Sequence, residues 1–190
     1  MTGLRLACVW VALAMVLQGP AALAAQFTVD EAALNRLEFP VPENGKERAY
    51  LGLSGNNTFR LPSVRVPILF VEIFSMYCPI CQSEAPKINE LYTRIQKSPT
   101  LKDKVKMVGI GIGNTPFEVE VFRKKFEIPF PLFSDEDFSV EKISRQRIRT
   151  PTFLVLEVEQ GNKVRILDAL VGRIEDIAGL VENLEQTKGK

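Results

Sequence analysis

The 190-residue sequence predicts an α/β domain built on a central mixed β-sheet flanked by helices, with an N-terminal hairpin. Three observations support this fold class. Nearly continuous apolar runs suit strands that are buried on both faces. Segments with apolar residues at a helical period separate these runs. The chain then ends with a hairpin and a helix, so the sheet combines parallel and antiparallel strands.

The N-terminal part is expected to be an extended, loosely packed arm over residues 25–46. This stretch is polar and contains a Pro-x-Pro motif and an Asn-Gly turn. Segments 49–55 and 56–64 are interpreted as two short strands, which form a hairpin at the edge of the main sheet.

The first buried strand is predicted over 66–74, where the only charged residue is Glu72. A helix should begin at Cys78, because Ile88 and the apolar residues after it recur at helical spacing. Pro86 lies inside this helix and is expected to kink it.

A second buried strand is predicted over 104–113, followed by a helix. Thr115 is its expected N-cap, with Pro116 at the first helical position and Glu118 completing a capping box. Its buried face is predicted from four apolar residues, Phe117, Val121, Phe122 and Phe126.

The remaining elements are short. We expect a strand over 130–135, a helix over 137–148, and a hairpin of strands 150–159 and 163–172 around a Gln-Gly-Asn turn. The last helix begins near residue 174 and turns its apolar side chains inward.

Residues 1–24 are interpreted as an export signal. Arg5 precedes an apolar run over 6–17, and Ala22 and Ala24 fit the small-residue pattern of a cleavage site. The run is shorter than the ~20 residues that span a bilayer, so we expect cleavage rather than a retained anchor. The mature chain would be periplasmic or otherwise extracytoplasmic.

Composition excludes several classes of chemistry. The chain has 24 basic and 23 acidic residues and no long charge run, so nucleic acid is not an expected partner. It contains no histidine, which removes Ser-His-Asp and Cys-His catalysis and His-ligated metals. No cofactor or metal is expected.

Cys78 and Cys81 are the two cysteines of the mature chain, and they are only three positions apart. A ring this small is a poor structural staple, because stabilisation by a cross-link grows with the length of the loop it closes. Two thiols without histidine also do not complete a zinc site. In an oxidising compartment, the pair favours redox chemistry.

The expected site follows from the start of the helix. N–H groups and the helix dipole favour the Cys78 thiolate, and Pro79 fits the first turn. Cys81 lies one turn further and can resolve a mixed disulfide. Glu72, six residues before Cys78 in an apolar strand, is a candidate proton acceptor whose pKa burial should raise. Glu84 is a second acid that can tune the sulfurs, or a solvated surface glutamate.

These motifs make residues from about 47 to 187, within an expected domain over 47–190, resemble the thioredoxin-like superfamily, in particular its exported TlpA/ResA-type thiol-disulfide oxidoreductases. The resemblance lies in the strand Phe-Val-Glu-Ile-Phe, the Cys-Pro-Ile-Cys motif, Glu84, Pro86 and the downstream Thr-Pro-Thr-Phe-Leu-Val. It implies a buried acid at Glu72 and a cis peptide bond between Thr150 and Pro151. We expect Thr150, Pro151, Tyr77 and Pro79 to bind the substrate.

The sequence departs from the family in ways that bear on function. Tyr77 stands where the family usually has tryptophan, and no histidine lies between the cysteines. Without an imidazolium beside Cys78, a reductant is favoured over a strong oxidant. The resemblance implies exported proteins with disulfides or thiols as partners, with apocytochrome c as one possible client. It also implies a membrane or periplasmic electron donor, and we expect a monomer.

Two alternatives use the same cysteines. A peroxiredoxin-like thiol peroxidase is suggested by Ser75, three residues before Cys78, and by Arg149 before the proline loop. A soft-metal protein would bind copper through the two thiolates, with Met76 as a third ligand. Packing is the more common role of such a methionine.

Overall fold

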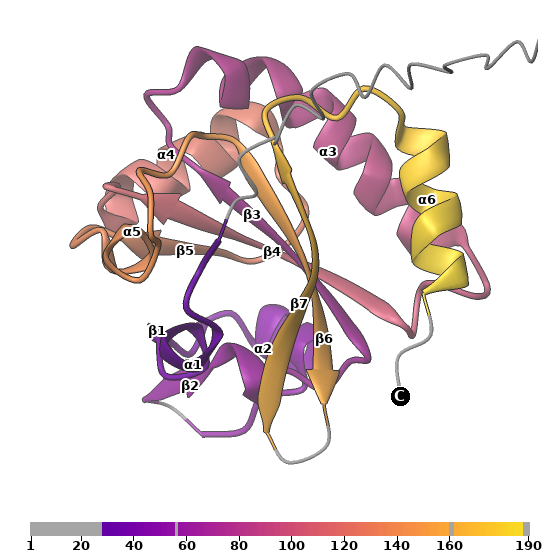
Figure 1. Cartoon of the computed structure of the whole chain (residues 1–190), viewed down its shortest axis with the longest axis horizontal. Coiled ribbons are helices and arrows are strands. Elements are labelled where there is room, and N and C mark those ends of the chain that lie inside the picture. Colours follow the sequence, from indigo (N-terminus) through magenta and orange to yellow (C-terminus); the bar gives the residue numbers. More distant parts are fainter. Residues whose placement is uncertain (1–27, 56, 160–161, 188–190) are drawn as a thin grey trace, which may run out of the picture.

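The central sheet of the protein has five strands in the order β5-β4-β3-β6-β7 (Figure 1). The computed structural model describes residues 28–55, 57–159 and 162–187. The strands are β3 (Ile68–Phe74), β4 (Val105–Ile112), β5 (Leu132–Asp135), β6 (Thr152–Glu159) and β7 (Lys163–Val171). β3 and β4 are parallel, as are β4 and β5, whereas β6 is antiparallel to both β3 and β7. The predicted mixed sheet is therefore confirmed.

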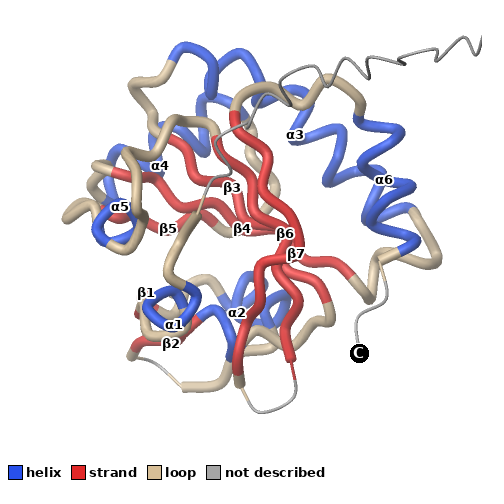
Figure 2. Tube along the Cα trace, viewed as in Figure 1, coloured by secondary structure: helices blue, strands red, loops and turns tan. Residues whose placement is uncertain are grey.

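Helices cover both faces of this sheet (Figure 2). They are α1 (Glu31–Leu34), α2 (Gly45–Leu51), α3 (Pro79–Lys97), α4 (Pro116–Phe126), α5 (Ser139–Lys142) and α6 (Ile177–Gln186). A short 3-10 turn, η1, spans Leu61–Ser63. α3 follows β3 after residues 75–78 and continues through Pro86 as one helix.

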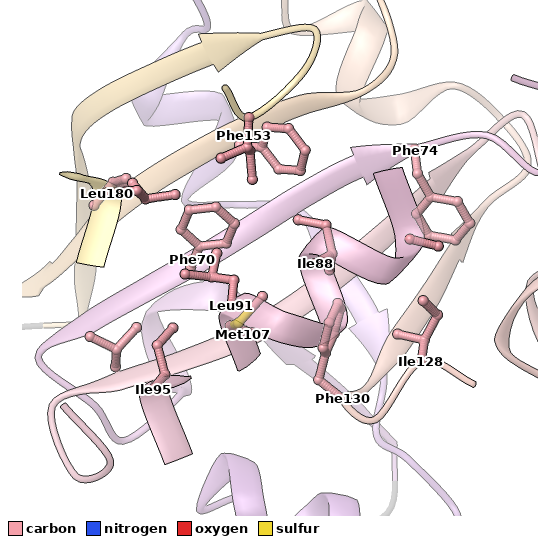
Figure 3. Packing of buried hydrophobic residues seen from close by; sticks show 14 of the residues in the cluster. Phe70, Phe74, Ile88, Leu91, Ile95, Met107, Ile128, Phe130, Phe153 and Leu180 are labelled. Atoms are coloured by element: carbon pink, nitrogen blue, oxygen red, sulfur yellow. The ribbon is translucent and has the colours of Figure 1, made fainter. Parts of the chain in front are cut away.

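The two faces of β3 belong to two hydrophobic clusters, because successive side chains of a strand point to opposite faces. Phe70 and Phe74 pack with Ile88 and Leu91 of α3, together with residues of α4 and α6 (Figure 3). Leu69, Val71 and Ile73 face the second cluster, which includes residues of α2, α5 and the N-terminal hairpin. Every residue of β3 is buried, as its sequence predicts. Glu72 belongs to the same side as Phe70 and Phe74.

The N-terminal hairpin exists, but its strands differ from those expected. β1 (Glu38–Pro40) pairs antiparallel with β2 (Thr58–Arg60), and the two form a separate two-stranded sheet. Segment 49–55, predicted as a strand, is instead the end of α2 and its left-handed Gly52 cap. The prediction failed because Asn44 caps a helix that begins within the supposed arm. Phe39 and Leu34 are buried, so this arm is packed rather than loose.

Two helix predictions also need correction. The capping box of α4 is present, but Phe117 is 77% exposed and Val119 replaces it on the buried face. The helix predicted over 137–148 is only the single turn α5, after which residues 143–149 run as a loop. Ser144 forms an isolated bridge with Val29 there, so tertiary pairing replaces the helix.

Some sequence predictions fall on residues that the structure leaves undescribed. The export signal at 1–24, the start of the arm and part of the Gln-Gly-Asn turn lie outside the described residues. Among the helices within the described ranges, none combines the length and the hydropathy that crossing a membrane requires.

Candidate active site

Both cysteines lie where β3 gives way to α3. Cys78 is the N-cap residue of α3, and its sulfur accepts the N–H of Cys81 at 3.3 Å. The Cys78 thiol also donates to the carbonyl of Thr150 at 3.2 Å. Both cysteines are free thiols, Cys78 partly exposed and Cys81 buried. The pair therefore presents one accessible and one shielded sulfur, as the sequence predicts.

The two thiols have opposite acidities. Partial burial raises the pKa of Cys78, but hydrogen bonding to the Thr150 side chain, the Cys81 thiol and the N–H groups of Cys81 and Ile80 outweighs it. The net pKa of Cys78 is lowered from its ordinary value. Burial raises the pKa of Cys81 far above its ordinary value, and its hydrogen bond with Cys78 adds to this. Cys78 is therefore the nucleophile that ionises first.

A proline loop faces Cys78 from the start of β6. The Thr150–Pro151 peptide bond is cis, which confirms the expectation from the family resemblance. The Pro151 carbonyl accepts the N–H of Gly172 at 2.8 Å, and the Thr152 hydroxyl donates to the Arg149 carbonyl at 2.5 Å. These contacts fix the loop against the end of β7 while leaving Arg149 exposed.

Glu72 lies in the core behind the cysteines. It is 1% exposed, and its register neighbours are Gly109 on β4 and Phe153 on β6. Burial raises the pKa of Glu72 to about 8, with smaller contributions from the charges of Glu84 and Cys78. Its Oε2 has no hydrogen-bond partner among the described residues. The carboxyl group can thus exchange a proton near neutral pH.

Glu84 is also buried. It is therefore not a solvated surface glutamate, which was one of the two predictions for this residue. Its Oε1 lies 2.8 Å from Arg173 and 3.7 Å from Lys87. Its Oε2 accepts the N–H of Ile174 at 3.0 Å. Glu84 therefore ties α3 to the loop between β7 and α6 and places a charged group in the helix that carries both cysteines.

Tyr77 and Pro79 flank the first cysteine. Tyr77 is 65% exposed, and its hydroxyl donates to the Glu118 carboxylate at the start of α4. Pro79 is the first residue of α3. Both lie beside Cys78, just after the end of β3. Thr150 and Pro151 lie at the same end of the sheet, just before the start of β6. Their role in binding a substrate stays a prediction.

Sequence reasoning missed two residues of this region. Asn114 is fully buried, and its Oδ1 accepts the N–H of Met76 at 2.8 Å, which holds the loop before Cys78. Arg173 pairs with Glu84 from a segment 89 positions away. Asn114 is a polar residue directly after a buried strand, which is a usable signal. No local pattern links Arg173 to Glu84.

The fold and the cysteine pair define a thiol-disulfide oxidoreductase of the thioredoxin-like type. The chain belongs to the AhpC/TSA family, whose model matches residues 43–157. Thiol-disulfide oxidoreductase ResA of Geobacillus thermodenitrificans is 26% identical over 126 residues, or 66% of this chain and 68% of ResA. ResA of Geobacillus kaustophilus is 27% identical over 96 residues, or 50% of this chain and 52% of its own.

Solved structures share the fold. StoA from Bacillus subtilis has a TM-score of 0.51 at 21% identity, covering 67% of this chain and 88% of StoA. A secreted disulfide oxidoreductase of Mycobacterium tuberculosis, described as homologous to E. coli DsbE, has a TM-score of 0.56 at 14% identity. That match covers 82% of this chain and 98% of the other.

The residues that suggest the two alternative chemistries make other contacts in the structure. The Ser75 hydroxyl accepts the Tyr77 N–H at 3.4 Å, and within the described part of the chain neither Ser75 Oγ nor Arg149 hydrogen-bonds the Cys78 sulfur. Met76 packs against the hydrophobic core. No group of three or more His, Cys, Asp or Glu side chains that could hold a metal occurs among the described residues.

Proposed function

We propose that this chain is an extracytoplasmic reductase of disulfides in other exported proteins. The observation that carries the proposal is the contrast between the two sulfurs. Cys78 is accessible and has a lowered pKa, whereas Cys81 is buried one turn away and has a raised pKa. An accessible nucleophile with a shielded partner suits attack on a large substrate followed by internal release.

The reaction balances over two steps. The Cys78 thiolate attacks one sulfur of the client disulfide, forming a mixed disulfide and releasing the first client thiolate. Cys81 then loses its proton and attacks the Cys78 sulfur, forming the Cys78–Cys81 disulfide and releasing the second client thiolate. The client gains two electrons and two protons, and a dithiol reductant must return the oxidised chain to its starting state.

We assign to Glu72 the proton that Cys81 gives up. The raised pKa of Cys81 means that this thiol needs a base before it can attack. A buried carboxyl group with a pKa of about 8 accepts and returns protons readily at neutral pH. Glu84, held by Arg173 and Ile174, keeps a charge near this exchange and so raises the proton affinity of Glu72.

The direction of electron flow and the location rest on the sequence. Pro79 and Ile80 between the cysteines supply no cation to stabilise the Cys78 thiolate, which favours a reductant over a strong oxidant. The segment at 1–24 has the features of an export signal. Apocytochrome c, whose cysteines must be reduced before haem attachment, is a client that fits this chemistry.

The reduction potential of the Cys78–Cys81 pair tests the proposal. The mature chain is equilibrated in glutathione or dithiothreitol buffers, and the fraction of disulfide is followed by mass after alkylation. We expect a value near that of thioredoxin, about −270 mV. A value near −120 mV would make the chain a disulfide donor instead. If no reversible disulfide forms, the proposed oxidoreductase function is wrong. Metal binding by the two thiolates is then the alternative to measure.

A further inference from the structure

Three arginines occupy every second position just before the proline loop. They are Arg145, Arg147 and Arg149, here called the arginine row. All three are exposed. Within the described residues, none of the three has a carboxylate within 4.0 Å, although eight ion pairs form elsewhere. A row of unpaired guanidinium groups is a ready donor set for carboxylates, which arginine binds in a bidentate manner.

The backbone under the arginine row is held in place. Ile148 is buried, and its N–H donates to Glu141 Oε2 at 3.2 Å. The N–H of Arg145 donates to the Thr28 carbonyl at 3.3 Å, beside the bridge between Val29 and Ser144. Ile148 is buried, whereas Arg147 and Arg149 on either side of it are exposed. The charges are thus presented by an anchored segment.

This segment leads directly to the reactive sulfur. Arg149 is bonded to Thr150, whose carbonyl lies 3.2 Å from the Cys78 sulfur. An extended chain rises ~3.3 Å per residue, so Arg145 lies within ~17 Å of Thr150 along the backbone. Tyr77, next to Cys78 in the chain, contacts the carboxylate of Glu118 at the start of α4. A segment bound at Cys78 and extending along residues 145–149 would therefore meet the cations of the arginine row.

We propose that the arginine row selects client proteins whose reactive cysteine lies in a segment carrying Asp or Glu side chains. This inference rests on the proposed function and names the kind of partner for the same site. Acidic residues of a client lying along residues 145–149 would pair with the row while the client sulfur meets Cys78. Such pairing accelerates encounter and fixes orientation, and it weakens as salt screens the charges.

A protein client is favoured over an anionic membrane as the partner of this row. Recognition of anionic lipids commonly uses clusters of four to eight Lys or Arg side chains. The arginine row has three, and the whole chain carries a net charge of only +1. The row also lies next to the site of disulfide exchange, where a membrane surface has no reactive group to offer.

The test compares two synthetic peptides with the same intramolecular disulfide, one with three Glu residues beside it and one with Gln in their place. The rate of reduction by the reduced chain is measured for each. We expect the Glu peptide to react about tenfold faster in low salt, with the ratio approaching one in ~0.5 M NaCl. Replacing all three residues of the row by Gln should bring the ratio to about one in low salt as well.

A charge-matched variant serves as the control. Lys97, Lys102 and Lys163 are exposed residues at the opposite end of the molecule, at the end of α3, just after it, and at the start of β7. Replacing these three by Gln removes the same net charge and should leave the peptide preference unchanged. A loss of preference in this variant would show that net charge, and not the row, is responsible, and would overturn the proposal.

The remaining outcomes separate the two proposals. Equal rates for both peptides, with normal reduction of the neutral hydroxyethyl disulfide, would overturn the acidic-client inference and leave the reductase function standing. If neither the peptides nor hydroxyethyl disulfide oxidises the cysteine pair, the proposed function itself fails. Row-dependent binding to phosphatidylglycerol vesicles without any peptide preference would assign the row to a membrane and overturn the inference.

Discussion

Arg173 Nη1 lies 2.8 Å from Glu84 Oε1 and joins the loop after β7 to the helix that carries both cysteines. Glu84 is fully buried, whereas Arg173 is 46% exposed. The guanidinium thus reaches inward from the surface to a carboxylate that water does not reach. Because a buried unpaired charge is strongly unfavourable, this contact should matter for stability.

Arg173→Gln should therefore lower the free energy of unfolding by about 1–3 kcal/mol. The loss is smaller than for a buried carboxylate with no partner, because the Ile174 N–H and Lys87 still contact Glu84. Urea unfolding of the reduced protein measures this change. Arg94→Gln is the matched control, because its partner Glu90 is about half exposed and the pair should contribute less than ~1 kcal/mol. Equal losses in the two variants would contradict the role given to Arg173.

Glu72→Gln should remove a pH dependence of stability. The folded-state pKa of Glu72 is about 8 and its ordinary value is 4.5, so the folded protein binds more protons between these values. Its contribution to stability is complete below pH ~4.5 and falls as the pH rises towards 8. Between pH 5 and pH 9, the free energy of unfolding of the reduced wild type should fall by at least ~1.4 kcal/mol more than that of the variant. This amount corresponds to a pKa difference of one unit.

The measurement is urea unfolding of both reduced proteins across this pH range, with Glu90→Gln as an exposed control that should keep the wild-type profile. Parallel profiles for the wild type and Glu72→Gln would mean that Glu72 titrates near its ordinary pKa and is not the proton acceptor.

Local signals in the sequence were strong enough to predict the sheet and the position of the cysteine pair. The apolar run around Glu72 is a buried strand as predicted, and Thr115 with Glu118 correctly predicts the start of α4. The apolar pattern places Phe117 on the wrong face of α4, because it treats every apolar residue as a core residue.

The parts that could not be predicted depend on contacts between distant segments. The pairing of β1 with β2 skips over α2, and no local pattern indicates that residues 38–40 lie beside residues 58–60. The burial of Glu84 likewise depends on Arg173 and Ile174 from the far end of the chain. A helical glutamate is ordinarily solvated, so its role became clear only when these partners were located.

Asn114→Ala should destabilise the loop that precedes Cys78. The change leaves the N–H of Met76 without its acceptor in a part-buried position, which costs about 1–3 kcal/mol of the free energy of unfolding. Gln82 holds the same residue from the other side by donating to the Met76 carbonyl at 2.7 Å, so the loop should stay folded. Asn183→Ala on the exposed face of α6 is the control and should change stability by less than ~0.5 kcal/mol. A similar effect of both variants would show that the contact with Met76 is not important.

Alkylation should distinguish the two cysteines. In the reduced protein, iodoacetamide should modify Cys78 first, because its pKa is lowered and its sulfur is accessible. In Cys81→Ser, the alkylation rate of Cys78 should rise with pH as the thiolate fraction grows, because alkylation proceeds through the thiolate. This variant should also accumulate a mixed disulfide with a client, since no second thiol is left to release it. Cys78→Ser should react slowly and trap nothing. Faster alkylation of Cys81, or trapping by Cys78→Ser, would reverse the roles of the two sulfurs and with them the proposed order of attack.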